Sequence, residues 1–269
     1  MNTVIESFER IKQQVVQISK SLRIDKLQNH LGRKLALSIE DSIALALFKQ
    51  RQGIETKKSV WEIFALKKVC SYKTLVVSLN RWYHLALAIV GLILNHNRQT
   101  THPVKHIDST NIPVCRNKNA KHHQTMKEYA SWSHNGQDYY YGLKLHLIAD
   151  LKERVLALKF APADIDERVV ATPLADGLSG IFVADAGYVS AELEKNFYQE
   201  GQRYILIKPK KNQRKVATKL DVLLYSTRML IEIPFRILKM FHGLITSLPR
   251  SVAGYLANYT YSLLAYLIV

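Results

Sequence analysis

The sequence predicts an α/β protein in which helices flank a mixed sheet and an all-helical region comes first. Three observations lead to this prediction. Apolar residues recur at helical spacing through residues 1–100. From residue 104 onward, short stretches alternate apolar and polar residues, as half-buried strands do. Helical and strand-like segments then alternate towards the end of the chain, an order typical of a sheet covered by helices.

The composition is that of a basic globular protein. The 269 residues are 48% apolar and 22% charged, which excludes a disordered chain and allows one large domain or two ordinary ones. The formal net charge is +16, with 16 Lys and Arg against 7 Asp and Glu in residues 1–100 and 22 against 15 in residues 101–269. A positive excess spread over the chain suits a protein that binds nucleic acid; a merely basic soluble protein is the alternative.

The sequence indicates a cytoplasmic location. Cys70 and Cys115 are far apart and form no C-x-x-C pattern, so we expect neither a disulfide framework nor a zinc site. The first twenty residues lack the apolar core of a signal peptide. Residues 251–269 carry no charge and are long enough to cross a bilayer, but Asn258 and Thr260 interrupt them. We therefore expect a buried C-terminal helix and no membrane partner.

Residues 1–100 are predicted to be a helical domain. Helices are expected over 39–50 and 56–68, and one long helix or two over 71–94. The lysines around these short helices suit a helix-turn-helix DNA reader, and equally a small bundle with solvated lysines. The stretch NHNRQTTHP, residues 95–103, loses apolar periodicity and is predicted to be the linker to a second domain, residues 101–269.

The second domain is predicted to contain five strands. They are expected over residues 104–115, 139–150, 155–163, 180–188 and 203–211. Helices are expected over 164–178 and 190–201, and DLKER between the second and third strands indicates a hairpin turn. The polar stretch 116–138 is long for a loop, which indicates either disorder or a flap that contacts DNA.

The stretch YSTRMLIEIPFRILK, residues 225–239, is predicted to be a mostly buried helix with a narrow polar stripe. At 100° per residue, four polar side chains fall within an arc of about 60°. They are Tyr225, Arg228, Glu232 and Lys239. Pro234 lies inside this helix and should bend it or remove a hydrogen bond. The simpler interpretation is an amphipathic helix with an ordinary Arg228–Glu232 pair.

Two aspartates occupy positions where a carboxylate needs a cation. Asp108 lies in the middle of the first predicted strand, and Asp185 follows the apolar run IFVA. If these two strands are neighbours, the two carboxylates come together and the helix with Glu232 can close over them. Three such carboxylates suit Mg²⁺, and two ions can activate water and stabilise a leaving oxygen in phosphodiester cleavage.

Other acidic residues compete with these three. Asp164, Asp166 and Glu167 cluster at a helix start, where capping and the helix dipole account for them. Asp138 and Asp150 stand at strand ends and are interpreted as turn residues.

Residues 104–269 resemble the DDE transposases of bacterial insertion sequences, in the branch with the signature Y-x2-R-x3-E-x6-K. Tyr225, Arg228, Glu232 and Lys239 match that spacing without a gap. Asp108 in HIDST matches the first acidic position and Asp185 in VADAGY the second. Ala186 departs from the pattern, because many relatives have a charged residue before the glycine.

The resemblance implies a ribonuclease H-like fold and a metal-dependent enzyme. Asp108, Asp185 and Glu232 would be the catalytic metal ligands for Mg²⁺ or Mn²⁺, with two ions expected. Tyr225, Arg228 and Lys239 would contact the DNA end. The partners would be double-stranded DNA, both the terminal inverted repeats of the transposon and the target, and a homodimer is expected when two ends are paired.

Two other functions remain open from the sequence. A stand-alone metal-dependent nuclease of the same fold would cleave DNA without joining it. A DNA-binding protein could retain the fold without catalysis.

Overall fold

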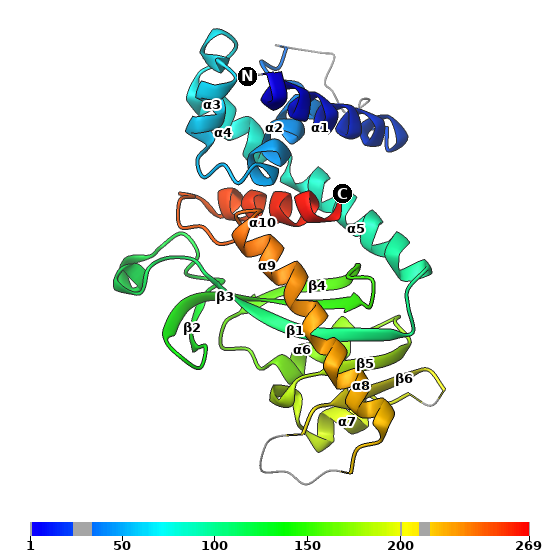
Figure 1. The fold of residues 1–269 in the computed structure, drawn as a ribbon. Helices are drawn as coiled ribbons and strands as arrows, with labels where there is room; N and C mark the ends of the chain where they lie inside the picture. The colour runs from blue at the N-terminus through cyan, green and yellow to red at the C-terminus, as the bar shows by residue number, and fades with distance from the viewer. Residues whose placement is uncertain (1, 24–33, 200, 210–215, 269) are drawn as a thin grey trace. The chain divides into compact units, whose positions relative to one another are not determined.

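The structure, a computed structural model, describes residues 2–23, 34–199, 201–209 and 216–268. The chain forms two compact units. The first, here called the helical unit, comprises Met1–Gly91 and Ile237–Val269, and the second, the sheet unit, comprises Leu92–Arg236 (Figure 1).

The helices of the helical unit are α1 (Asn2–Ser21), α2 (Ile39–Arg51), α3 (Lys57–Ile63), the short 3₁₀ helix η2 (Leu66–Lys68), α4 (Tyr72–Arg81), the first half of α5 (Tyr83–Gln99), and α10 (Val252–Leu267). Four helices of the helical unit, α2, α3, α4 and α10, begin at polar capping residues. The hydroxyls of Ser38, Thr56 and Ser71 each accept a hydrogen bond from the backbone N–H three residues later, which satisfies a donor that the helix leaves unpaired. The stretch 71–94 forms two helices, separated at Trp82.

The C-terminal helix α10 is buried against α2, as the sequence predicted. Ten of its sixteen residues are buried, and the Gln50 amide donates to the carbonyl of Asn258 and to the hydroxyl of Ser262 at 3.0 and 2.8 Å. The polar residues of 251–269 thus bind a neighbouring helix. Residues 237–269 consequently belong to the helical unit, so the compact units do not divide at residue 100.

Among the described residues, Tyr72–Gln99 is long enough to cross a membrane and contains an 18-residue window with a mean hydropathy of 1.4. This is a property of length and composition, and the core helix of a soluble protein shares it.

The sheet unit contains a six-stranded mixed sheet. Its strands are β1 (Val104–Pro113), β2 (Ser131–His134), β3 (Tyr139–Asp150), β4 (Val155–Pro162), β5 (Gly180–Ala184) and β6 (Arg203–Ile207). Their order is β2-β3-β1-β5-β6, and β4 also pairs with β3. β3 runs antiparallel to its neighbours β1, β2 and β4. β5 runs parallel to its neighbours β1 and β6. The predicted strands are therefore present, and the last two residues of the strand predicted over 203–211 lie outside the described residues.

The segment 116–138 contains structure that the sequence did not predict. It includes the 3₁₀ helix η3 (Asn117–His122) and the strand β2, which pairs with Tyr139–Gly142 of β3. β2 was missed because SWSH is a short polar strand in which the two exposed positions include Trp132.

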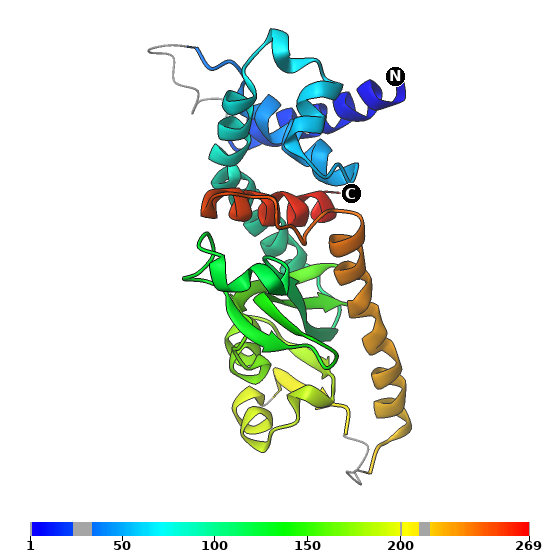
Figure 2. The same cartoon turned by 90° about the vertical axis from the view of Figure 1, so that its left-hand side faces the viewer.

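Helices cover both faces of the sheet. On one face α6 (Glu167–Leu174), the 3₁₀ helix η4 (Ala186–Tyr188) and α7 (Ala191–Phe197) share a core with Ile107, Phe182 and Ile205. On the other face α8 (Lys219–Thr227) packs through Leu224 against Val104, Val183 and Leu206. Figure 2 shows this layering, with the yellow-green helices on one side of the strands and the orange helix on the other.

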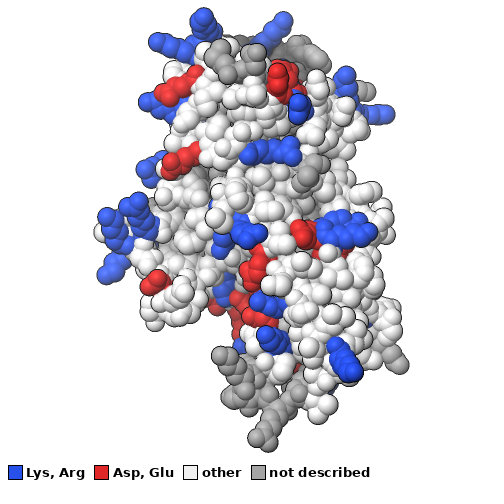
Figure 3. Space-filling model, viewed as in Figure 1, with Lys and Arg blue, Asp and Glu red and all other residues white. Residues whose placement is uncertain are grey.

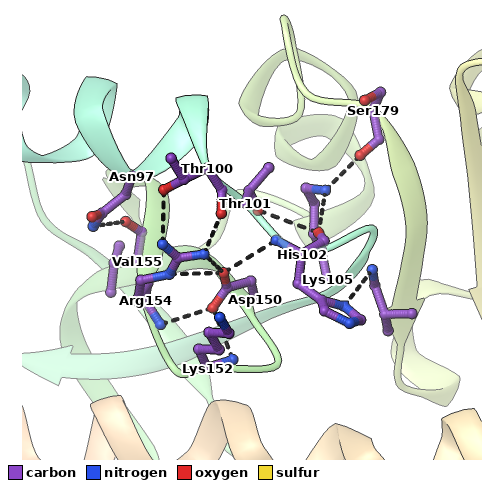
Figure 4. A network of polar contacts seen from close by, with 11 residues as sticks. Asn97, Thr100, Thr101, His102, Lys105, Asp150, Lys152, Arg154, Val155 and Ser179 are labelled. Carbon is purple, nitrogen blue, oxygen red and sulfur yellow. Dashed lines mark hydrogen bonds and ion pairs between the residues drawn. The ribbon is translucent and has the colours of Figure 1, made fainter.

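The end of α5 forms hydrogen bonds with the sheet and is not a linker. α5 continues to Gln99. The Asn97 side chain donates to the carbonyl of Val155 at 3.0 Å (Figure 4). The Arg98 side chain donates to the carbonyl of Leu156 at 2.8 Å. The expectation of a linker over 95–103 was therefore wrong for 95–99. The polar side chains of Asn97 and Arg98 donate hydrogen bonds to strand carbonyls instead of to water.

The buried carboxylate of Asp150 organises the turn between β3 and β4. It accepts two hydrogen bonds from the Arg154 guanidinium at 2.7 and 3.0 Å, and Arg154 also donates to the hydroxyl and carbonyl of Thr100 (Figure 4). Burial alone would raise the pKa of Asp150, but the hydrogen bonds from Arg154 outweigh it and hold the pKa below its ordinary value. The interpretation of Asp150 as a turn residue is confirmed.

The predicted helix over 225–239 is interrupted. α8 ends at Thr227, residues Arg228–Ile231 form the 3₁₀ helix η5, and α9 (Glu232–Met240) follows. The tighter turn lies immediately before Pro234, which has no N–H to donate to the carbonyl of Leu230. The expectation of a mostly buried helix over 225–239 was wrong, because Met229 is 68% exposed and most of the range is not buried. Its buried residues are Ile231, Pro234, Phe235 and Leu238.

The packing of α10 predicts unequal effects of two leucine truncations in one helix. Leu264 is fully buried, so Leu264→Ala should lower the free energy of unfolding by about 2–5 kcal/mol through lost burial and a cavity. Leu256 is 37% exposed, so Leu256→Ala is the matched control and should cost clearly less. Urea denaturation of the two variants measures both; equal losses would contradict the burial of α10 described here.

Candidate active site

Asp108 and Asp185 stand at corresponding positions on neighbouring parallel strands. β1 pairs with β5 in the register His106↔Val183, so each aspartate lies two residues beyond this pair. Neighbouring strands are about 4.8 Å apart, which brings the two carboxylates to the same end of the sheet. Asp185 follows the last residue of β5 and caps η4 by accepting a hydrogen bond from the Gly187 N–H at 2.8 Å. The arrangement that the sequence allowed, with these two strands as neighbours, is therefore present.

Gly187 packs closely against the carboxylate of Asp185. A Cβ at this position would lie 3.0 Å from Oδ1 of Asp185, closer than most such contacts allow. Its absence leaves room for the carboxylate beside the backbone.

Arg228 connects the first aspartate to Glu232. Its Nη1 donates to Oδ2 of Asp108 at 2.8 Å, and its Nη2 lies 3.6 Å from Oε1 of Glu232. The side chains of Asp108, Arg228 and Glu232 are 14%, 25% and 59% exposed. The short Arg228–Asp108 contact is therefore more enclosed than the longer Arg228–Glu232 contact. Glu232 is linked to Asp108 by way of Arg228.

The carboxyl of Asp108 has a raised pKa. Burial is the main cause and the charge of Asp185 the next, and together they raise the pKa of Asp108 to about 7. The hydrogen bond from the Ser109 N–H and the charge of Arg228 act in the opposite direction, and the charge of Glu232 raises the pKa further. Asp108 is thus surrounded by more negative charge than Arg228 compensates.

Glu167 is a fourth carboxylate at this site, which the sequence did not assign to it. Its Oε1 accepts a hydrogen bond from the Ser109 hydroxyl at 2.6 Å and lies 3.5 Å from the Lys144 ammonium. Its Oε2 lies 3.7 Å from the position that a Cβ on Gly187 would occupy. Asp166 does cap α6, as interpreted, but Glu167 beside it points to β1. Only the adjacency of α6 and β1 reveals this, and no local pattern encodes it.

Tyr188 lies beneath these carboxylates. Its side chain is fully buried, and among the described residues its hydroxyl has no hydrogen-bond partner. Its pKa is well above the ordinary value because of burial and then the charges of Asp108, Glu167 and Asp185. The hydroxyl therefore stays protonated next to three carboxylates.

His106 fixes the segment that carries Arg228. Its Nε2 is 2.9 Å from the hydroxyl of Thr227, the residue before Arg228. Burial and then the charge of Arg228 lower the pKa of His106 to about 4, so the ring is neutral at neutral pH. A neutral ring adds no competing positive charge beside Arg228.

The remaining residues of the signature are Tyr225 and Lys239. The hydroxyl of Tyr225 donates to the carbonyl of Ile207 in β6 at 3.0 Å. Lys239 lies near the end of α9, in the part of that helix that belongs to the helical unit.

The residues of the site are of the types that bind a cation, but they are not arranged as a metal-binding group. Four carboxylates, those of Asp108, Asp185, Glu167 and Glu232, face the two cations Arg228 and Lys144. Oxygen ligands with surplus negative charge fit a hard divalent ion. In the part of the chain that the structure describes, however, no group of three or more His, Cys, Asp or Glu is placed to hold a metal ion. The charges of Asp185 and Glu232 both act on Asp108, and Arg228 contacts Asp108 and Glu232.

Comparisons with known proteins give one family and one fold. Residues 98–251, more than half of the chain, match the family model described as "Transposase DDE domain". Among curated protein sequences, none matches. The chain is similar in fold to a solved cryo-EM structure, the piggyBac transposase synaptic complex with hairpin DNA, with a TM-score of 0.51 and 11% sequence identity. The match covers 96% of this chain and 72% of the other.

The pKa of Asp108 predicts a pH-dependent cost of ionisation when divalent metal is absent. The carboxyl holds its proton up to about pH 7 in the folded state but only to about pH 4 when unfolded, so stability falls as the pH rises between these values. Asp108→Asn removes this cost. In EDTA its melting temperature should match that of the wild type near pH 4 and exceed it at pH 8.

The control is Asp176→Asn, because Asp176 is an exposed aspartate outside the site. Its melting curve should run parallel to that of the wild type. A parallel curve for Asp108→Asn as well would show that Asp108 ionises normally.

Proposed function

Because the chain belongs to the DDE transposase domain family, whose members cleave and transfer DNA strands, we propose that it is a transposase acting at the ends of a mobile element. The observation that carries this proposal is the pairing of Asp108 with Asp185 on neighbouring strands, coupled through Arg228 to Glu232. The finer assignment is to the bacterial insertion-sequence branch, because the signature from Tyr225 to Lys239 has its spacing.

We propose that the fold is ribonuclease H-like. Antiparallel strands around β3 followed by the parallel neighbours β1, β5 and β6, with helices on both faces, support this assignment. The fold similarity to the piggyBac transposase agrees with it.

Members of the DDE transposase family generally use divalent metal ions. We propose that Asp108, Asp185 and Glu232 hold them, as Mg²⁺ or Mn²⁺ and with two ions. The ions would supply a water of lowered pKa and a positive charge for the leaving oxygen of the phosphodiester.

The side chains of the protein prepare the site for this chemistry. Arg228 neutralises Asp108 while the carboxylates are close together, and it leaves Glu232 half exposed and able to turn inward. Glu167 holds the hydroxyl of Ser109, which follows Asp108, and so limits the movement of β1 at the site. The arginine that stabilises the metal-free state would be released to contact a DNA phosphate when metal binds.

The proposed partner is double-stranded DNA, as the terminal inverted repeats and as target. The net charge of +16 supports a polyanionic partner, and the similar piggyBac structure is a synaptic complex with hairpin DNA. Tyr225, Arg228 and Lys239 are the proposed contacts to the DNA end. Synapsis of two ends requires two active sites, so a homodimer is proposed, acting in the bacterial cytoplasm at the nucleoid. Residues 1–100 are proposed to read the end sequence, with helix-turn-helix geometry as the hypothesis.

Asp185→Asn tests whether catalysis is separable from DNA binding. It removes one charge from the proposed metal ligands and leaves the basic surface intact, so end binding should persist. Strand cleavage and strand transfer with Mg²⁺ should fall by about 100-fold or more, since losing a supporting residue alone costs roughly 10- to 100-fold at metal sites. Asp176→Asn is the matched control. Loss of binding together with cleavage in a folded protein would contradict the assignment.

The same assay separates the alternatives. Cleavage without joining of a terminal-repeat duplex to target DNA would identify a nuclease. End binding without cleavage in the wild-type protein would identify a non-catalytic DNA-binding protein.

Lys239→Ala tests the proposed contact to the DNA backbone. Each phosphate contact contributes about 0.9 to the slope of log affinity against log salt on duplex DNA, so this variant should bind ends more weakly and with a slope smaller by about that amount. Its stabilisation by Mn²⁺ should be unchanged, whereas Arg228→Ala should alter both quantities because Arg228 also contacts Asp108. Lys152→Ala, at an exposed turn, is the control. An unchanged salt slope would remove Lys239 from the interface.

A further inference from the structure

The hairpin of β2 and β3 presents a row of aromatic rings that the proposed catalysis does not use. Trp132 lies opposite Tyr141 and His134 opposite Tyr139, so the four rings share one face of the hairpin. The ring centroids are 5.6 Å apart in the first pair and 4.9 Å in the second. Trp132 is 45% exposed and Tyr139 65% exposed. These four rings are here called the aromatic face.

Basic side chains border the aromatic face. The Asn117 amide in η3 donates to the carbonyl of Tyr139 at 2.6 Å, and the ring of His123 lies 6.3 Å from that of Tyr141. The neighbouring cations are all exposed, and they are Arg116, Lys118, Lys121 and Lys127. Two carboxylates, Glu128 and Asp138, occur in the same segment. Figure 3 shows Lys and Arg gathered at the left of the molecule, over the segment that precedes β2 in Figure 1.

The aromatic face continues the side of the sheet that carries Asp108. Asp108 is paired with Leu147 in β3, and every second residue back along β3 leads to Tyr141 and Tyr139. Leu147 and Tyr141 are six residues apart, a distance of about 20 Å along the strand. Leu143 and Leu145 between them are 5% and 0% exposed, so the aromatic face is a surface separate from the candidate active site.

We propose that the aromatic face and its basic border bind unpaired, single-stranded DNA, with bases stacked on Trp132 and Tyr139. The choice of DNA rests on the proposed function. Single-stranded nucleic acid is bound where exposed aromatic rings stack on bases and adjacent cations follow the backbone, and both parts are present here. A duplex buries the faces of its bases within its own stack, so the rings have no equivalent contact with it. The occupant would be a strand separated at the transposon end during cleavage.

The test is the affinity of the full chain for a labelled oligo(dT) strand of about 15 nucleotides, measured by fluorescence anisotropy in EDTA. Trp132→Leu and Tyr139→Leu should each weaken binding about tenfold, because stacking of one base on one ring contributes on this scale. Tyr139→Phe keeps the ring and should bind as the wild type does. Lys118→Ala should reduce the salt slope by about 0.7, the value for one contact to a single strand.

The matched control is Tyr198→Leu, since Tyr198 is 55% exposed and lies after α7, outside the aromatic face. It should leave oligo(dT) binding unchanged. Melting temperatures establish that each variant is folded.

Two results would overturn the proposal. One is wild-type binding of oligo(dT) no tighter than that of Trp132→Leu and Tyr139→Leu. The other is an equal loss of affinity for a duplex of the same length in those variants, which would identify a general DNA surface. Cleavage of a duplex end in Mg²⁺ is measured separately, so failure of the transposase assignment is distinguishable from failure of this one.

Discussion

The ion pair between Arg228 and Asp108 is the interaction on which the arrangement of the site depends. An enclosed carboxylate beside Asp185 is costly to ionise, and Arg228 supplies the compensating charge from a helical segment on one face of the sheet. The same guanidinium is near Glu232. His106 and Thr227 fix the backbone just before it. Strand β1 and the segment from Thr227 to Glu232 are therefore held together by charge as well as by apolar packing, and the pairing is strongest where the carboxylates are most crowded.

Local sequence patterns predicted much of this arrangement. Alternation of apolar and polar residues predicted β1, β3 and β4. Short apolar runs predicted β5 and β6, which have residues in the cores on both faces of the sheet. The position of Asp108 within a strand and of Asp185 just after one follows from the same patterns. Their convergence also followed, since neighbouring parallel strands place corresponding residues side by side. The spacing from Tyr225 to Lys239 identified the helical segment that carries Arg228 and Glu232.

What the sequence did not predict depends on contacts between distant segments. Glu167 has the local signature of a helix start, and only the packing of α6 against β1 turns it towards Ser109. Asn97 and Arg98 have the composition of a linker, yet they bind carbonyls of β4. The polar stripe was predicted to lie on one continuous α-helix. Residues Arg228–Ile231 form a 3₁₀ helix instead, so the stripe does not follow the turn angle of an α-helix there. Periodicity reports which side of an element is apolar, but not which partner its polar groups find.

The helical unit is built from both parts of the chain that flank the sheet unit, and this fixes the order in which the protein can mature on the ribosome. α10 is translated after all of Leu92–Arg236, so the sheet unit is complete before the surface of α2 that α10 covers has its partner. Ten of the thirteen residues of α2 are buried in the finished protein. During that interval the side of α2 that α10 covers is exposed, while α1 and α4 can already pack on its other sides. Exposed apolar surface of this kind is what chaperones bind. α2 is thus synthesised before the sheet unit but reaches its final packing after it.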